Sequence, residues 1–328
     1  MYSYNVSDVH NSGRGDILVW HAIATYEQGG QARPALVLGD ELFDMAGVVS
    51  AARAGGLAAA EIPSVAALID AWETQGGQLR ALAEAAQGMR AAGAIRPLAA
   101  GYTLAVPFVP GRIFATASNY YDHAAEMGTE LAPRAESSPY CFMKAETSVT
   151  ATGTDVVMPG DTEKLDWEVE LAVVIGRTCK DVPVAQAYDV IAGYTVFNDI
   201  SARDLNRRSD YPFKHDWFRG KSFDTFGPMG PWIVPRDCIA DPQKLRMQLQ
   251  VNGDVMQDDT AEGMIFNIAE QIAYLSGILT LKPGDMIATG TPDGVGMGRG
   301  VYLKPGDEMV ASIERIGSIR NKVVAAAR

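Results

Sequence analysis

One short segment limits the possible folds strongly, because it leads acidic side chains directly into an apolar run. Residues 166–170 read Asp-Trp-Glu-Val-Glu, and residues 171–175 continue as Leu-Ala-Val-Val-Ile. On a strand, Glu168 and Glu170 point to the same face, because side chains alternate with a period of two. Buried carboxylates need compensation, so the segment predicts either a shared proton or a bound cation.

A third acidic residue favours the cation. Asp199 ends a second apolar run that begins at Ile191. Three carboxylates at the ends or faces of neighbouring strands make an all-oxygen site. Without Cys or His nearby, such a site suits Mg²⁺, Mn²⁺ or Ca²⁺ better than Zn²⁺. The alternative is an exposed edge strand whose Glu side chains are solvated.

The N-terminal part of the chain alternates strands and helices. Residues 1–15 are polar and predict a loose arm. Two strands are expected around a turn at 27–30, followed by helices. Ser64 has the character of an N-cap for a helix that carries Val65, Leu68, Ile69 and Trp72 on one face. The stretch around residues 91–110 is rich in Ala, Gly and Pro, so we predict a small domain over 1–105 and a larger one over 106–328.

Short strands separated by Gly and Pro turns dominate the larger region. The pair Asn252-Gly253 follows a strand-like run and predicts a hairpin. Asn267 and Glu270 have capping-box spacing and predict the start of a helix. These patterns predict an α+β fold that is mostly β, with a smaller N-terminal α/β domain.

Composition excludes several functions. The 328 residues carry a net charge of −12, which disfavours binding to nucleic acids or anionic membranes. The three cysteines are scattered, which is typical of a reducing compartment. No signal peptide or apolar run of the roughly 20 residues that span a bilayer is visible, so a cytoplasmic protein is expected.

Two further sites have the character of catalytic groups. His123 and Glu126 follow a strand and are three residues apart, so on a helix they share a face and can form a general base. An ordinary polar pair on a surface helix is the alternative. Lys221 lies between Gly and Ser and is a candidate for stabilising an anion. The Gly-rich loop 289–296 lacks nucleotide-binding spacing, but its backbone N–H groups can hold a carboxylate.

Six motifs occur in an order that resembles the fumarylacetoacetate hydrolase family, over about residues 110–325. No single motif is specific, whereas the combination is. The motifs are Asn119-Tyr-x-Asp-His123-x-x-Glu126, Phe142-x-Lys144, Asp166-x-Glu168-x-Glu170-Leu-Ala-Val-Val-Ile-Gly176, Asn198-Asp-x-Ser-Ala-Arg-Asp204, Lys221-x-x-Asp224-x-Phe-x-Pro-x-Gly230-Pro and Thr289-Gly-Thr-Pro-x-Gly294-Val-Gly.

The resemblance implies a mixed β-sandwich roll, usually a homodimer, with a Mg²⁺ or Mn²⁺ site formed by Glu168, Glu170 and Asp199. It implies 2-oxo acid substrates, often 2,4-dioxo acids from aromatic catabolism. His123, paired with Glu126, would activate water, and Lys221 would stabilise oxyanion charge. The residues implied to bind substrate are Tyr120, Lys144, Arg203, Asn206, Arg207, Gly290 and Thr291.

One departure from the family bears on the substrate. Eukaryotic members carry a further aspartate ligand before the lid histidine, and residues 112–118 contain none. The resemblance, with this departure, therefore implies a metal-dependent hydrolase that cleaves a C–C bond in a smaller acylpyruvate such as fumarylpyruvate. Two alternatives stay open: an isomerase or decarboxylase of a 2-hydroxymuconate-type diacid or oxaloacetate, and a non-catalytic 2-oxo-acid-binding protein. Residues 128–139 are predicted to form a lid.

Overall fold

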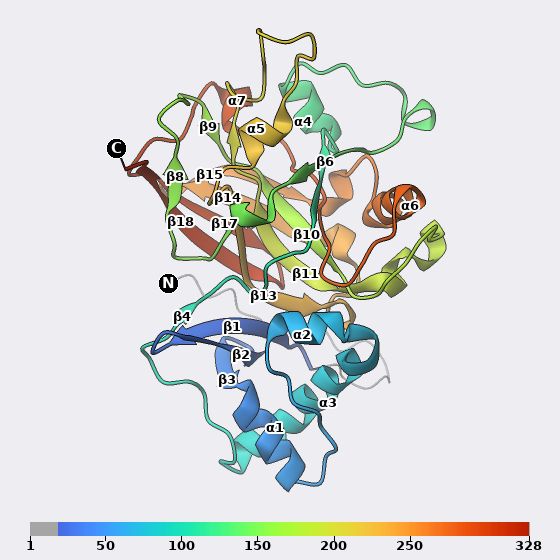
Figure 1. The fold of residues 1–328 in the computed structure, drawn as a ribbon, viewed down its shortest axis with the longest axis vertical. Coiled ribbons are helices and arrows are strands. Elements are labelled where there is room, and N and C mark those ends of the chain that lie inside the picture. The colour runs from blue at the N-terminus through green and yellow to red at the C-terminus, as the bar shows by residue number, and fades with distance from the viewer. Residues whose placement is uncertain (1–18, 328) are drawn as a thin grey trace.

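The computed structural model describes residues 19–327 and is built mainly of strands (Figure 1). The predicted arm at residues 1–15 lies outside this part of the chain. The strands are β1 (Ala22–Gln28), β2 (Gln31–Leu38), β3 (Glu41–Asp44), β4 (Thr103–Leu104), β5 (Ile113–Ala117), β6 (Tyr140–Lys144), β7 (Val149–Thr150), β8 (Val156–Met158), β9 (Leu165–Asp166), β10 (Val169–Ile175), β11 (Ile191–Asn198), β12 (Ser201–Ala202), β13 (Gly227–Pro235), β14 (Arg246–Val251), β15 (Asp254–Thr260), β16 (Met286–Ala288), β17 (Glu308–Ile313) and β18 (Gly317–Ala325). The helices are α1 (Met45–Ala54), α2 (Val65–Asp70), α3 (Trp72–Ala91), α4 (Tyr121–Glu126), α5 (Trp217–Lys221), α6 (Ile268–Ile278) and α7 (Gly296–Arg299).

The strands form a large sheet, a second sheet and a short two-stranded pair. The large sheet has the order β3-β2-β1-β13-β11-β10-β16-β5-β6, with β4 on β1 and β7 on β13. The second has the order β15-β14-β17-β18-β8, and β12 pairs with β9. Most neighbours are antiparallel, whereas β5–β16, β7–β13 and β8–β18 are parallel. The predicted class, α+β and mostly β with mixed sheets, is confirmed.

The two acidic segments lie in the centre of the large sheet. β10 pairs with β11 in antiparallel register, with Val169 opposite Asn198 and Glu170 opposite Phe197. The other neighbour of β10 is β16, so β10 is not an edge strand. Glu168 is 5% exposed and Glu170 is 1% exposed, which makes the solvated edge-strand alternative wrong.

The N-terminal strands extend the large sheet. β1 pairs with β13 through Ile23 and Ile233, and α1–α3 lie at this end of the molecule (Figure 1). Ile23, Ile233 and Phe197 belong to one buried hydrophobic cluster, so the core passes continuously between the two regions. The division into domains at residue 105 stays a prediction.

Local signals explain several of these elements. Asn252 and Gly253 both have positive φ and join β14 to β15, as the predicted hairpin requires. Asn267 and Glu270 form the predicted capping box of α6. Ser64 caps α2, but that helix ends at Asp70 and Trp72 begins α3, so the prediction of one continuous face was wrong. Within residues 19–327, no helix is long and apolar enough to cross a bilayer.

Candidate active site

Three buried carboxylates converge beside the β10–β11 pair. Glu168 immediately precedes β10, Glu170 lies within it, and Asp199 follows β11. One oxygen from each carboxylate lies within 4.8 Å of the other two. The backbone supports this arrangement, because Asp199 N donates to Glu168 O at 2.9 Å. The acidic spacing and the strand pairing together assemble one oxygen-rich centre.

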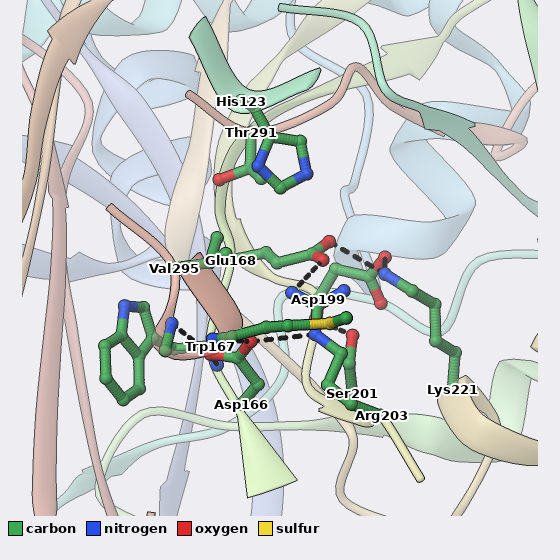
Figure 2. Close-up of polar contacts among 12 residues, drawn as sticks. His123, Asp166, Trp167, Glu168, Asp199, Ser201, Arg203, Lys221, Thr291 and Val295 are labelled. Atoms are coloured by element: carbon green, nitrogen blue, oxygen red, sulfur yellow. Dashed lines mark hydrogen bonds and ion pairs between the residues drawn. The ribbon is translucent and has the colours of Figure 1, made fainter. Parts of the chain in front are cut away.

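Two buried lysines partly balance the charge of this centre. Lys221 Nζ lies 2.7 Å from Glu168 Oε2 and 2.5 Å from Asp199 Oδ2 (Figure 2). Lys144 Nζ pairs with the other oxygen of Asp199. Burial lowers the pKa of Lys144, although Asp199 acts against this, whereas the carboxylates outweigh burial and raise the pKa of Lys221. Lys221 therefore stays protonated over the physiological range.

A fourth carboxylate and an arginine complete the charged network. Arg203 Nε donates to Asp166 Oδ2 at 2.7 Å, and Arg203 Nη2 lies 2.7 Å from Glu168 Oε1. Four carboxylates thus face three cationic side chains. Among the described residues, Glu170 is the carboxylate of this group that has no Lys or Arg within ion-pair distance.

This imbalance perturbs the ionisation of the carboxylates. Burial, with Asp199 and Glu168 beside it, raises the pKa of Glu170 well above its ordinary value. Burial also opposes ionisation of Glu168, but Lys221 and Arg203 outweigh it and lower the pKa of Glu168 to about 2. A divalent cation would offset the repulsion at Glu170, and carboxylate oxygens are ligands that Mg²⁺ and Mn²⁺ prefer. The triad therefore fits a hard divalent metal.

A histidine and a glutamate face the same region from α4. His123 Nδ1 lies 2.8 Å from Glu126 Oε1, and the histidine is 6% exposed. A carboxylate can only accept, so Nδ1–H donates to Glu126 and Nε2 stays outside this hydrogen bond. The expected i, i+3 pairing on a short helix is confirmed, and a general base needs this orientation of the ring.

A glycine-rich turn, residues 294–297, fixes the glutamate of this pair. Gly294 N donates to Glu126 Oε2 at 3.0 Å, and Val295 N lies 3.5 Å from Glu126 Oε1. The carboxylate is thus held between the backbone of this turn and the ring of His123. This support restricts how the imidazole can rotate.

The same turn also holds the partner of Arg203. Gly296 N and Met297 N donate to the two oxygens of Asp166 at 2.6 and 3.0 Å. A Cβ on Gly296 would lie 2.6 Å from Asp166 Oδ1 and 2.2 Å from a backbone oxygen, so only glycine fits. One backbone turn therefore orients both the His123 side and the Arg203 side of the site.

Gly298 offers a direct test of this support. A Cβ at Gly298 would lie 2.4 Å from Glu126 Oε2, so Gly298→Ala must displace the Glu126 side chain. Because that side chain is flexible and Gly298 is exposed, we expect a nearly unchanged melting temperature. Misplacement of a catalytic group by about 1 Å costs up to about 100-fold, so kcat should fall by about 10- to 100-fold.

Gly88→Ala is the matched control, because its Cβ would meet nothing within 4 Å. Thermal unfolding and steady-state kinetics of both variants would separate the two effects. Wild-type kcat in Gly298→Ala would show that the turn does not position Glu126.

The catalytic candidates open onto one cavity of about 150 Å³, which His123, Glu168, Glu170 and Lys221 line. Four of the seven predicted substrate-binding residues also line it, namely Arg203, Asn206, Arg207 and Thr291. Asn206 Oδ1 is buried and has no hydrogen-bond partner among the described residues. Buried polar atoms are normally satisfied, so a ligand or water is expected there.

The other three predicted substrate-binding residues, Tyr120, Lys144 and Gly290, do not line this cavity. Lys144 pairs with Asp199, and Gly290 N donates to Glu170 Oε2 at 2.9 Å. Both groups thus contact carboxylates of the triad, and their role in binding substrate stays a prediction. Burial raises the pKa of Tyr120, whose hydroxyl has no partner within residues 19–327.

Thr291 lines the cavity, but its hydroxyl is engaged as well. Thr291 Oγ1 donates to Val169 O at 2.8 Å and accepts from Gln257 Nε2 at 2.8 Å. Its only proton is therefore used, and the hydroxyl cannot donate to a substrate carboxylate in this arrangement. Gln257, which sequence reasoning missed, instead fastens this loop to β15.

Other residues of the site were also missed. Trp217, Met297, Thr129 and Ser118 line the cavity, and no spacing rule points to them because they lie on separate loops and short helices. Asp166 is different, because it continues the alternating acidic pattern of 168 and 170. The same period of two that predicted the triad could have identified it.

The segment that forms this site matches a known family. The family model described as fumarylacetoacetate (FAA) hydrolase, C-terminal, matches residues 112–324. A 2,4-didehydro-3-deoxy-L-rhamnonate hydrolase from Sphingomonas sp. (strain SKA58) is 38% identical over 305 residues, which cover 91% of this chain and 94% of the relative.

Solved structures are similar over almost the whole chain. A maleylpyruvate hydrolase from Sphingobium sp. SYK-6, in complex with manganese(II) ion and pyruvate, has a TM-score of 0.71 and 28% identity, covering 93% of this chain and 100% of that chain. A 5-carboxymethyl-2-hydroxymuconate delta-isomerase from Mycobacterium smegmatis has a TM-score of 0.69 and 29% identity, covering 94% and 100%. Hydrolases and isomerases thus share this fold.

Proposed function

This chain belongs to the fumarylacetoacetate hydrolase family, and we propose that it is a divalent-metal-dependent hydrolase that cleaves the C–C bond of an acylpyruvate. The single observation that carries the proposal is that a metal-binding triad and a histidine–glutamate pair lie at the same cavity. The buried triad of Glu168, Glu170 and Asp199 holds one centre, and His123 with Glu126 forms the other. A metal-binding group and a general base on one cavity are what hydrolysis of a 2,4-dioxo acid requires.

Glu168, Glu170 and Asp199 are the residues that would hold the cation, Mg²⁺ or Mn²⁺. When bound, the cation would supply Lewis-acid stabilisation of the 2-oxo acid end as negative charge develops there. The manganese ion of the similar maleylpyruvate hydrolase supports this assignment.

The side chains of this chain supply the remaining steps. His123, with its Nδ1–H held by Glu126, takes a proton from water at Nε2 as the water adds to the 4-oxo carbon. The C3–C4 bond then breaks, and its electron pair leaves with the three-carbon fragment. Protonation of C3 gives pyruvate, and the acyl fragment leaves as a carboxylic acid. Lys221 remains protonated beside the carboxylates and stabilises the developing anion.

The names of the relatives support a 2-oxo acid that carries a second polar group. One acts on maleylpyruvate, and another on a deoxy acid with oxidised positions 2 and 4. A second candidate function is isomerisation of a 2-hydroxymuconate-type diacid at the same site. The isomerase among the similar structures supports this candidate. Uptake of water separates the two, because hydrolysis consumes it and isomerisation does not.

An ultraviolet assay with product identification by mass tests the proposal. Purified protein with Mg²⁺ or Mn²⁺ would be offered fumarylpyruvate, acetylpyruvate, a 2-hydroxymuconate-type diacid and oxaloacetate. We expect pyruvate plus the matching acid from a dioxo acid, and loss of this activity with EDTA. An isomerised diacid, or CO₂ released without water uptake, would establish the alternative and contradict C–C hydrolysis.

A further inference from the structure

The edge strand of the second sheet, β15, buries one glutamine. Gln257 is 1% exposed, whereas the other side chains of β15 are exposed or half-buried. Gln257 pairs with Leu249 and Val255 pairs with Gln250, so Met256 is an extra residue that forms a β-bulge. A bulge re-aims the side chains of its strand. Because burying an amide costs free energy unless its polar groups are bonded, the partners of Gln257 matter.

The amide of Gln257 lies where β10 loses a neighbouring strand. The pairing of β10 with β16 stops at Ala172 on the side of the triad. Beyond this point, side chains bind both main-chain groups of Val169. Val169 N donates to Gln257 Oε1 at 3.0 Å, and Val169 O accepts from Thr291 Oγ1 at 2.8 Å. Side chains therefore take the place of a strand on this side of β10.

The three residues form a closed ring of hydrogen bonds. Gln257 Nε2 donates one proton to Thr291 Oγ1 at 2.8 Å, and the Thr291 hydroxyl donates its own proton to Val169 O. The second proton of Nε2 is donated to Pro292 O at 2.9 Å. A carboxamide has one oxygen acceptor and two donor protons, which matches these partners, whereas a hydroxyl or a carboxylate does not.

The ring holds the main chain from which two of the triad carboxylates project. Val169 separates Glu168 from Glu170, so its position sets where both side chains begin. The loop that the ring includes also contains Gly290, whose N–H donates to Glu170 Oε2 at 2.9 Å. Gln257 does not line the cavity, so any effect on the site must pass through these neighbours.

We propose that Gln257 is a positioning residue for the metal-binding carboxylates. Its carboxamide stands in for a strand beside Val169, and it fixes Glu168 and Glu170 relative to the loop that contacts them. The inference rests on the proposed divalent-metal function and adds a determinant of metal affinity that lies in the second sheet. Groups that orient metal ligands contribute to affinity although they do not touch the metal.

Gln257→Met tests the inference, because methionine keeps the length of the side chain but cannot form these hydrogen bonds. We expect Mn²⁺ binding, measured by isothermal titration calorimetry, to weaken by about 10- to 100-fold. Thr291→Val opens the same ring from its other side and should also weaken Mn²⁺ binding. If the ring acts as one unit, the double variant should bind Mn²⁺ little more weakly than Gln257→Met alone.

Gln243→Met is the matched control, because Gln243 also joins two segments through its amide. Its Nε2 donates to Ala261 O at 2.8 Å, and its Oε1 accepts from Ile268 N at 3.1 Å, with no contact to the triad. Both glutamine variants should melt at a lower temperature than the wild type, but Gln243→Met should keep its Mn²⁺ affinity.

Two results would overturn the inference and leave the proposed function intact. One is wild-type Mn²⁺ affinity in folded Gln257→Met or Thr291→Val protein, with circular dichroism as the check on folding. The other is an equal loss of affinity in Gln243→Met, which would reflect general destabilisation. Failure of the wild type to bind Mn²⁺ would instead contradict the metal site, and the proposed function with it.

Discussion

Replacing Glu170 with glutamine should weaken Mn²⁺ binding by more than about 100-fold, because even the loss of an outer-shell partner costs about 10- to 100-fold. Glu170 is the carboxylate of the buried group that lacks a cationic partner within the described residues, so it depends most on a bound cation. Glutamine keeps the shape and one oxygen but removes the charge. Isothermal titration calorimetry with Mn²⁺ measures the change directly, without any assumption about the substrate.

The control is Glu163→Gln, which makes the same chemical change at an exposed position outside the triad. It should bind Mn²⁺ like the wild type. We expect Glu170→Gln to fold normally, because it leaves no void and removes repulsion between buried carboxylates. Circular dichroism checks the fold. Mn²⁺ affinity at the wild-type level in a folded Glu170→Gln variant would disprove the three-carboxylate site.

Replacing His123 with alanine should lower kcat by about 100- to 10,000-fold, the range that a positioned general base contributes. Glu126 accepts a hydrogen bond from Nδ1–H of His123. The other ring nitrogen, Nε2, is therefore the one proposed to take a proton from water. Glu126→Gln keeps a hydrogen bond to His123 but removes the negative charge, so kcat should fall less than in His123→Ala. Both effects should appear in kcat, whereas Mn²⁺ affinity should remain close to that of the wild type.

Asp122→Asn provides the comparison for this pair, because Asp122 is the exposed neighbour of His123 on α4. It should leave kcat near the wild-type value. Full activity of His123→Ala with the substrate identified in the assay would show that another group activates water, and the proposed mechanism would be wrong.

The carboxylate triad and the His123–Glu126 pair were predictable, because each depends on a short repeat. Glu168 and Glu170 share a face through the period of two in a strand, and His123 and Glu126 through one turn of a helix. Their supporting contacts were not predictable. Lys144 pairs with Asp199, 55 residues away, and Gly290 N donates to Glu170, and no local pattern predicts either contact. Which partner a buried donor takes depends on the packing of distant strands.

The sequence by itself determined the elements whose signals are local. These include the capping box at Asn267, the Asn252-Gly253 hairpin, the alternating carboxylates and the mostly β class. Only the tertiary structure decided which loops meet. Gly294 N donates to Glu126 across 168 residues of chain, and the cavity of the site forms between segments that no periodic pattern relates. The physical reason is range: propensities and caps act over a few residues, whereas such contacts follow from the strand order of the whole sheet.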